Sequence, residues 1–228
     1  MKYFYILFFA PLALYAQISS GKVSYKLVFN DDVNLQKSDI GSLYSLAKEQ
    51  SEHMFYNLDF NSIESTFSSK QVIIKEDVNY ADIFSEASGI YYRKQADTLV
   101  YNALNDDNFG KIIIKYKDTI NWELTNETKM IDEFICYKAL SSYRIDNGKK
   151  IYTNKVVAWY CPTLPFQYGP RGFGGLPGLI FELQDQRVNF VLVSIKQVDN
   201  LKIEKPAAER IVSLKEYNQL LMNMNNDR

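Results

Sequence analysis

Apolar and polar residues alternate along most of this chain, and the alternation predicts a mainly β structure. From Gly21 to Asn30, apolar side chains occupy every second position between Val23 and Phe29. Period-two alternation of this kind is typical of a half-buried strand. The same pattern returns at residues 56–60, and later in segments separated by polar turns: Gly89–Lys94, Thr98–Leu104, Lys111–Tyr116, Thr119–Leu124, Phe134–Ile145, Gly178–Gln184 and Val188–Val198.

Two segments have helical periodicity instead. The first runs from Ser38 to Gln50, and the second begins at Ser213, where the Ser-Leu-Lys-Glu sequence matches a capping box. The second helix carries an apolar stripe of Leu214, Tyr217, Leu221 and Met224, which we expect to pack on the sheet, with a partner or membrane-surface role as the alternative. We therefore expect a single curved antiparallel sheet or half-barrel with one N-terminal and one C-terminal amphipathic helix. The pattern at residues 77–88 is too mixed to assign.

Composition excludes several classes of function. Among 228 residues, 26 basic and 27 acidic side chains give a net charge of -1, which offers no field to gather nucleic acids. His53 is the only histidine, so metal sites built on two histidines are excluded. The two cysteines cannot form a closed zinc site by themselves. We expect no metal and no cofactor.

The N-terminal 16 residues have the features of a secretory signal peptide. Lys2 precedes an apolar run from Tyr3 to Tyr15, and Ala16 stands at the expected cleavage position. A run of about 13 residues is shorter than the roughly 18 to 20 needed to span a bilayer. The sequence thus predicts a signal peptide at 1–16 and a single β-rich domain at 17–228, exported to the periplasm or beyond the cell, with no transmembrane segment after cleavage.

Cys136 and Cys161 lie in two segments that should form a hairpin. The Asn147-Gly148 dipeptide between them favours a two-residue turn. In that register paired positions sum to 295, which places Cys136 opposite Trp159 and leaves the two thiols diagonal, with Cα atoms about 7 to 8 Å apart. A disulfide fails beyond about 7 Å without backbone adjustment. Export to an oxidising compartment favours a disulfide between these cysteines, whereas this register disfavours one, so the sequence does not decide whether they are bonded. A catalytic thiol is not expected, because no base that would activate either cysteine can be identified.

Glycine and proline gather between Pro162 and Ile180, which indicates a long crossing loop that enters a strand. A phosphate cradle does not fit, because no Gly-Lys-Ser/Thr follows the glycines and the next segment is not a helix. The six residues Gly175, Leu176, Pro177, Gly178, Leu179 and Ile180 reproduce the motif that names the GLPGLI family of exported proteins from Bacteroidota. Similar segments occur in the family's order: Gly21–Tyr25, Trp122, Cys136–Ala139, Ala158–Tyr160 and Gly169–Pro170.

The resemblance to the GLPGLI family covers roughly residues 21–196 and implies an exported, predominantly β protein. The family has no established reaction, so it supplies no catalytic residue. Its pattern more often has a small hydroxyl residue where this chain has Cys161, so a disulfide would be particular to this protein or its close relatives. We read the motif as structural, with the glycines allowing a tight loop against aromatic neighbours; the alternative is a binding loop formed by Tyr168, Arg171 and Phe173.

Three functions remain open. The first is a non-enzymatic cell-envelope protein that binds an apolar or peptide ligand or an outer-membrane partner. Strands that are apolar on one face only, together with 17 tyrosines, favour a sheet that can shelter an apolar ligand. The second is an accessory structural subunit of an outer-membrane assembly. The third is a carboxylate-dependent hydrolase, for which the acidic groupings are Asp31-Asp32, Asp106-Asp107 and Glu182 with Asp185; solvated turns account for these groupings more simply.

Overall fold

The described part of the chain folds around one open sheet of twelve strands. The computed structural model describes residues 18–70, 78–106, 108–146 and 151–226. The strands are β1 Ser20–Phe29, β2 Phe55–Asn61, β3 Glu64–Ser69, β4 Ile90–Lys94, β5 Leu99–Asp106, β6 Gly110–Lys117, β7 Glu123–Ile131, β8 Phe134–Asp146, β9 Ile151–Cys161, β10 Leu179–Asp185, β11 Val188–Gln197 and β12 Arg210–Ser213. The mainly β prediction is confirmed. The predicted signal peptide lies outside the described residues.

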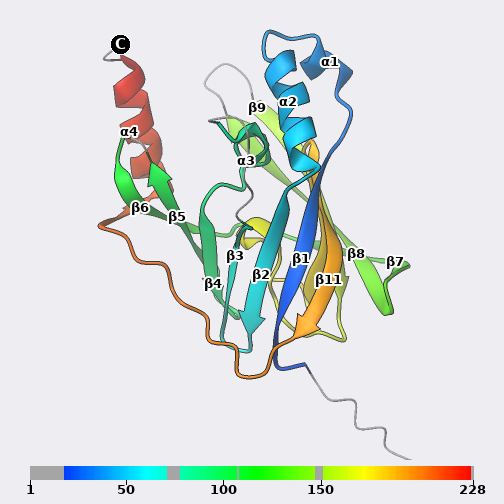
Figure 1. The fold of residues 1–228 in the computed structure, drawn as a ribbon. Helices are drawn as coiled ribbons and strands as arrows, with labels where there is room; N and C mark the ends of the chain where they lie inside the picture. Colours follow the sequence, from blue (N-terminus) through cyan, green and yellow to red (C-terminus); the bar gives the residue numbers. More distant parts are fainter. Residues whose placement is uncertain (1–17, 71–77, 107, 147–150, 227–228) are drawn as a thin grey trace, which may run out of the picture.

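The strand order is β12-β6-β5-β4-β3-β2-β1-β11-β10-β9-β8-β7, so β12 and β7 form the two edges. Neighbouring strands pair antiparallel except for β12, which pairs parallel with β6. The expectation of a purely antiparallel sheet is therefore corrected at one edge. A parallel pairing needs a long connection, and residues 198–209 provide it by running along the bottom of the molecule (Figure 1).

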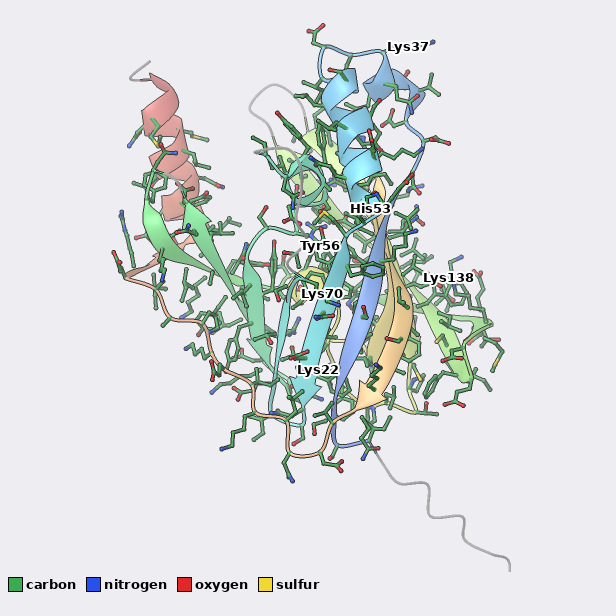
Figure 2. All side chains as sticks on the ribbon, viewed as in Figure 1. Lys22, Lys37, His53, Tyr56, Lys70 and Lys138 are labelled. Atoms are coloured by element: carbon green, nitrogen blue, oxygen red, sulfur yellow. The ribbon has the colours of Figure 1, made fainter. Side chains whose placement is uncertain are left out.

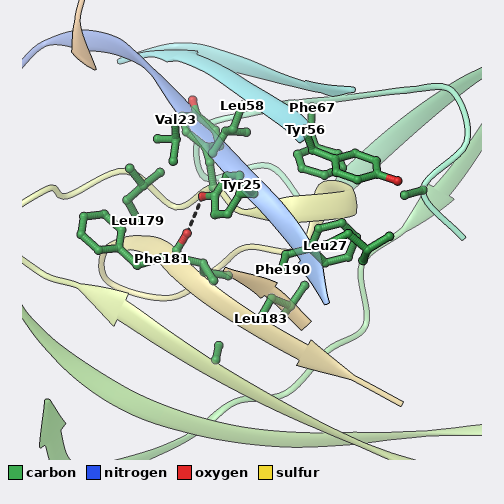
Figure 3. Packing of buried hydrophobic residues seen from close by; sticks show 14 of the residues in the cluster. Val23, Tyr25, Leu27, Tyr56, Leu58, Phe67, Leu179, Phe181, Leu183 and Phe190 are labelled. Carbon is green, nitrogen blue, oxygen red and sulfur yellow. Dashed lines mark hydrogen bonds between the residues drawn. The ribbon is translucent and has the colours of Figure 1, made fainter. Parts of the chain in front are cut away.

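Aromatic and aliphatic side chains of the inner face build the core (Figure 3). The rings of Phe67 on β3 and Phe190 on β11 lie 5.6 Å apart although three strand positions separate them, so the sheet curves around its own core. Tyr25 is fully buried, and its hydroxyl donates a hydrogen bond of 2.6 Å to the carbonyl of Ile180. That bond satisfies a hydroxyl whose burial would otherwise cost about 1 to 3 kcal/mol.

Four α-helices accompany the sheet in the described part of the chain: α1 Val33–Gln36, α2 Gly41–Ser51, α3 Tyr80–Ser85 and α4 Leu214–Asn226. The first three gather at one end of the sheet in Figure 1. The two-helix prediction misses α1 and α3, which are only four and six residues long. Both begin at a side-chain cap, from Asp32 and Asn79, and are too short to show a helical period. None of the helices in the described ranges has the length and apolarity needed to cross a bilayer.

Helix α4 begins at the predicted capping box. The Ser213 hydroxyl accepts from the Glu216 backbone N–H at 3.2 Å, and the Glu216 carboxylate accepts from the Ser213 N–H at 2.7 Å. The expected packing of its apolar stripe holds only in part: Tyr217 packs against a small cluster on β6 and β12, whereas Leu214 is 46% and Leu221 37% exposed. The reason is position, because α4 stands at the edge of the sheet and not over its face (Figure 1).

One predicted strand is wrong. Residues 119–122 are not extended in the sheet, and β7 starts only at Glu123. The side chain of Asp118 accepts from the N–H of Ile120 at 3.0 Å, which turns the chain away from β6. The short strands β3 and β12 were not predicted; β3 is rich in serine, and β12 has only four residues.

Candidate functional site

A cleft of about 410 Å3 lies between one end of the curved sheet and β8. Its walls come from β4, β5 and β6 on one side, from β8 on the other, and from residues 171–173 of the long loop. Strands β6 and β8 stand near opposite edges of the sheet. Curvature of the sheet around the loop therefore creates this cleft, which aromatic, aliphatic and charged side chains line together.

Arg171 is the central charged group of the cleft. It belongs to a short 3-10 helix, η1 (Pro170–Gly172), with a left-handed backbone (φ 55°). One guanidinium nitrogen, Nη1, donates to Asp185 Oδ2 at 2.7 Å, and Nη2 donates to Glu86 Oε2 at 2.6 Å. Glu86 also has a left-handed backbone (φ 51°). The two carboxylates differ sharply in environment, because Asp185 is fully buried whereas the Glu86 side chain is 59% exposed.

The surroundings of Arg171 keep it charged. Burial alone would lower its pKa, but the negative charges of Glu86 and Asp185 raise the pKa above the usual value. Behind it, the hydroxyl of Tyr143 donates to Asp185 at 3.0 Å and accepts from Gln186 at 2.9 Å. Burial and the Asp185 charge raise the pKa of Tyr143 to about 12. This phenol therefore acts as a hydrogen-bond donor at neutral pH and not as a base.

Two further tyrosines, Tyr91 and Tyr116, line the cleft. Burial raises the pKa of both phenols above the ordinary value, so each keeps its proton at neutral pH. Phe173 completes the aromatic lining, and its ring lies 5.6 Å from the Arg171 guanidinium carbon. The cleft thus combines an aromatic wall with a buried cation whose outward-facing partner is a solvent-exposed carboxylate.

A second arginine, Arg93 on β4, fixes the loop to the sheet. Arg93 is 3% exposed; its Nη1 donates to the Gly172 carbonyl at 2.7 Å and to Asp118 at 2.9 Å. Farther along the loop, the Trp122 indole N–H donates to the Gly174 carbonyl at 2.8 Å. These contacts hold residues 172–174 between β4 and the segment that follows β6.

The GLPGLI motif is part of the core in this structure. Leu176, Leu179 and Ile180 are at most 1% exposed. A Cβ on Gly178 would lie 2.3 Å from the Cys161 carbonyl oxygen, so only glycine fits there. The loop before the motif contacts Trp122, whose ring lies 6.5 Å from that of Phe173. In the described part of the chain no ring contact joins the motif to Trp159, although the structural reading places Trp159 beside it together with Phe173.

The three residues of the predicted binding loop separate in the structure. Arg171 and Phe173 line the cleft. Tyr168 is fully buried, and its ring stacks near that of Phe166 with centroids 6.5 Å apart, so it belongs to the core. Sequence reasoning therefore identified the loop and two of its cleft residues.

The acidic groupings do not form pairs of free carboxylates. Glu182 pairs with Lys129, whereas Asp185 pairs with Arg171. Asp106 accepts from the backbone of a turn, and Asp107 lies outside the described residues. Asp31 and Asp32 pair separately, with Lys48 and Arg187.

Metal-binding groups show no clustering in the described ranges: no three of their histidine, cysteine, aspartate and glutamate side chains lie where they could hold an ion. His53 lies exposed at the end of α2 (Figure 2). The cleft offers aromatic contacts and the buried Arg171, and its lining also includes the charged residues Lys117, Asp118 and Arg144.

The predicted register of β8 and β9 is wrong by two residues. Observed pairs sum to 297, as in Tyr137 with Tyr160, and the ladder ends at Asp146 with Ile151. The predicted Asn147-Gly148 turn lies outside the described residues, but four residues separate the last pair. Continuing the ladder past Tyr137 places Cys136 directly opposite Cys161, not diagonal to it. Both are buried thiols, and they share a hydrogen bond.

Sequence reasoning missed the cleft residues outside the loop: Glu86, which follows α3, and residues on the strands, including Tyr91, Asn102, Tyr116 and Tyr143. They are spread over nearly 60 residues of chain and share no spacing. The only usable signal was the abundance of tyrosine, which does not say which tyrosines meet.

Comparisons with known proteins support the fold and leave the activity open. A model of a family described as a protein of unknown function (Porph_ging) matches residues 146–182, the stretch that contains β9, the long loop and the start of β10. This short match is consistent with a Bacteroidota family, but membership of the GLPGLI family is not confirmed by it. No curated protein matches the sequence.

Two solved crystal forms of PNGF-II share the fold, with TM-scores of 0.57 and 0.56. Sequence identity is 14% in both, over 89% and 90% of this chain. The match covers only 32% and 33% of the PNGF-II chain, so this chain spans about one third of that protein. At this identity the likeness concerns the fold alone.

Proposed function

We propose that the chain is a non-enzymatic, exported cell-envelope protein that binds an apolar or peptide ligand in the Arg171 cleft. In this proposal the curved sheet acts as a half-barrel that shelters the ligand. The observation that supports this proposal most directly is the arrangement of Arg171. Its inner partner Asp185 is fully buried, and the side chain of its outer partner Glu86 is 59% exposed.

Glu86, the exposed partner of the buried Arg171, can be replaced by an acidic group of a ligand. An ion pair in contact with water contributes only about 0 to 1 kcal/mol, because solvent screens it and two side chains are immobilised. A ligand carboxylate that sits in the aromatic cleft can replace Glu86 on Nη2 of Arg171 at little cost. The apolar remainder of the ligand would then contact Phe173 and Tyr116. We infer that the ligand carries a carboxylate on an apolar or peptide body.

The lining groups favour binding over catalysis. Tyr91, Tyr116 and Tyr143 keep their protons at neutral pH because burial raises their pKa values. The inner carboxylate, Asp185, is engaged by Arg171 and by the Tyr143 hydroxyl. Such groups hold and orient a ligand, whereas general acid–base chemistry needs a group that changes its protonation near neutral pH.

Calorimetric titration with a matched pair of probes tests the proposal. The probes are the tripeptide Leu-Phe-Phe with a free C-terminal carboxylate and the same peptide with a C-terminal amide. We expect the free acid to bind at least about tenfold more tightly, a difference of about 1.4 kcal/mol. The same comparison with dodecanoate and dodecanamide covers a purely apolar body.

Two substitutions sharpen this experiment. Glu86→Gln removes the competing carboxylate and should tighten binding of the free acid. Glu127→Gln serves as the matched control, because Glu127 pairs with Lys138 outside the cleft. Equal affinity for acid and amide would refute the role of Arg171, and absence of binding by all four probes would refute the ligand class.

Export is tested separately from binding. The predicted cleavage after Ala16 leaves Gln17 as the first residue of the mature protein. N-terminal sequencing of protein recovered from a cell-envelope fraction should therefore begin at Gln17. Protein that retains Met1 and remains in the cytoplasmic fraction would contradict this part of the proposal.

The edge strand β7 supports a second candidate function, an accessory subunit of an outer-membrane assembly. Met130 on β7 and its partner Ile135 on β8 are 60% and 53% exposed. An uncovered apolar pair at a sheet edge can receive another protein. Native electrophoresis of an envelope extract should show a large complex that Met130→Lys disrupts.

A further inference from the structure

Cys136 and Cys161 end up face to face where two strands meet. The observed ladder of β8 and β9 ends at the pair Tyr137–Tyr160; extending its register by one position sets Cys136 opposite Cys161, and the two thiols share a hydrogen bond. Residues directly opposite in such a ladder have Cα atoms about 4.5 to 5.5 Å apart. That separation lies within the range of about 4.4 to 6.8 Å that disulfides span. Both side chains are fully buried.

We propose that Cys136 and Cys161 form an intrachain disulfide that closes the stem of the cleft loop. The pair joins β8 to the last residue of β9, immediately before the segment that carries Arg171. The proposal is independent of the ligand, since it rests on the strand register alone.

The two thiols are in direct contact in the folded chain. The Cys161 sulfur lies 2.9 Å from the Thr163 hydroxyl. Hydrogen bonds from the Cys136 thiol and from Thr163 lower the pKa of Cys161, whereas sharing its own hydrogen bond with Cys161, together with burial, raises the pKa of Cys136. The hydrogen bond between the thiols shows that the folded chain already holds the two sulfurs next to each other.

The reaction balances with a disulfide as oxidant, supplied by a thiol–disulfide oxidoreductase or a small-molecule disulfide. The thiolate of one cysteine attacks one sulfur of the oxidant, forming a mixed disulfide and releasing a thiol. The other cysteine then loses its proton, attacks the sulfur of the first cysteine and releases the second thiol. The chain loses two hydrogen atoms and the oxidant is reduced to two thiols. Because both sulfurs are buried in the folded state, the oxidant must reach them before the core closes.

The bond would restrain the loop at its base. The Cys161 carbonyl accepts from the Leu164 N–H at 3.2 Å, and Cys161 pairs with Leu179 on β10. Residues 162–178, which hold Arg171 in the cleft, therefore start and end beside this cysteine. Fixing Cys161 to β8 limits the freedom of the loop's first residues in partly unfolded states.

The experiment compares the full-length gene product recovered from an oxidising compartment with the same protein after reduction. Under denaturing conditions without reductant, we expect an intact mass two hydrogen atoms below that of the dithiol and no reactive thiol. Peptide mapping should join the Cys136 and Cys161 peptides. Reduction should lower the melting temperature by roughly 5–15 °C.

Variants separate the cross-link from other effects of reductant. Cys136→Ser and Cys161→Ser should each leave one reactive thiol and abolish the response of the melting temperature to reductant. If either serine variant fails to accumulate, the double variant with Cys136→Ala and Cys161→Ala takes its place. This variant keeps apolar side chains in the core, and its melting temperature should not respond to reductant. Two reactive thiols in the protein from the oxidising compartment, or disulfides to other molecules only, would overturn the proposal.

Discussion

The two carboxylates on Arg171 allow a paired prediction of stability. Asp185→Asn keeps the shape of the side chain but removes the charge that faces a buried guanidinium at 2.7 Å. Glu86→Gln makes the same chemical change at the other guanidinium nitrogen, at 2.6 Å, in a side chain that is 59% exposed. The distances to the guanidinium and the chemical change are matched; the two positions differ in burial and in the Tyr143 hydrogen bond that only Asp185 accepts.

The expected effects differ accordingly. Removing one partner of a buried ion pair costs about 3–5 kcal/mol, because the remaining charge stays desolvated. For a chain of this size each kcal/mol lowers the melting temperature by about 2–4 °C, so Asp185→Asn should lower it by about 6–20 °C. The Glu86 side chain is largely hydrated and Arg171 keeps its buried partner Asp185, so Glu86→Gln should cost no more than about 1 kcal/mol and change the melting temperature by less than about 4 °C.

Thermal unfolding followed by circular dichroism gives both shifts, and urea unfolding with comparison of the slopes shows whether the unfolded state has changed. Tyr143→Phe provides an intermediate case, because it removes no charge but only the hydrogen bond to Asp185 and the one from Gln186, each worth about 1 kcal/mol. Equal losses for Asp185→Asn and Glu86→Gln would refute the argument from burial. A loss below about 1 kcal/mol for Asp185→Asn would show that the Arg171 pair does not stabilise the loop.

Other positions yield further expectations. Gly178→Ala would place a Cβ 2.3 Å from the backbone oxygen of Cys161, which cannot move aside, so we expect a loss of about 1–3 kcal/mol in urea unfolding. Burial raises the pKa of Asp82, so the folded state keeps the proton of this carboxyl to higher pH than the unfolded chain does. The free energy of unfolding should therefore fall as the pH rises past about 4. Asp82→Asn should reduce this fall, which urea unfolding at a series of pH values across that range measures. Ser213→Ala removes the hydroxyl that accepts from Glu216 and should weaken the start of α4 by about 1 kcal/mol, visible as faster amide exchange there.

Local signals predicted local structure well. The alternation from Val23 to Phe29 identified β1, and the Ser213–Glu216 capping box identified the start of α4. Each depends on residues that are neighbours in the chain, so the physical cause lies within a short window. The turn at Asp106 was also read correctly, because its carboxylate accepts from the N–H groups of Asn108 and Phe109, and such turn chemistry is equally local.

Signals failed where a distant partner decides the outcome. Residues 119–122 have strand-like composition, yet Asp118 turns the chain and no neighbouring strand pairs with them. The apolar stripe of α4 is regular, but a helix at the edge of a sheet can cover only part of it, which leaves Leu221 exposed.

The sequence by itself determined that this is a mainly β chain with a glycine-rich loop that enters a buried strand, because alternation and glycine placement act on the nearest neighbours. Only the tertiary structure decided which side chains meet. A shift of two residues in one hairpin moves the cysteines from a diagonal to a direct pair, and curvature of the sheet brings Glu86 and Asp185 to the same arginine. Register and curvature arise from packing across the whole core, which no short window of sequence contains.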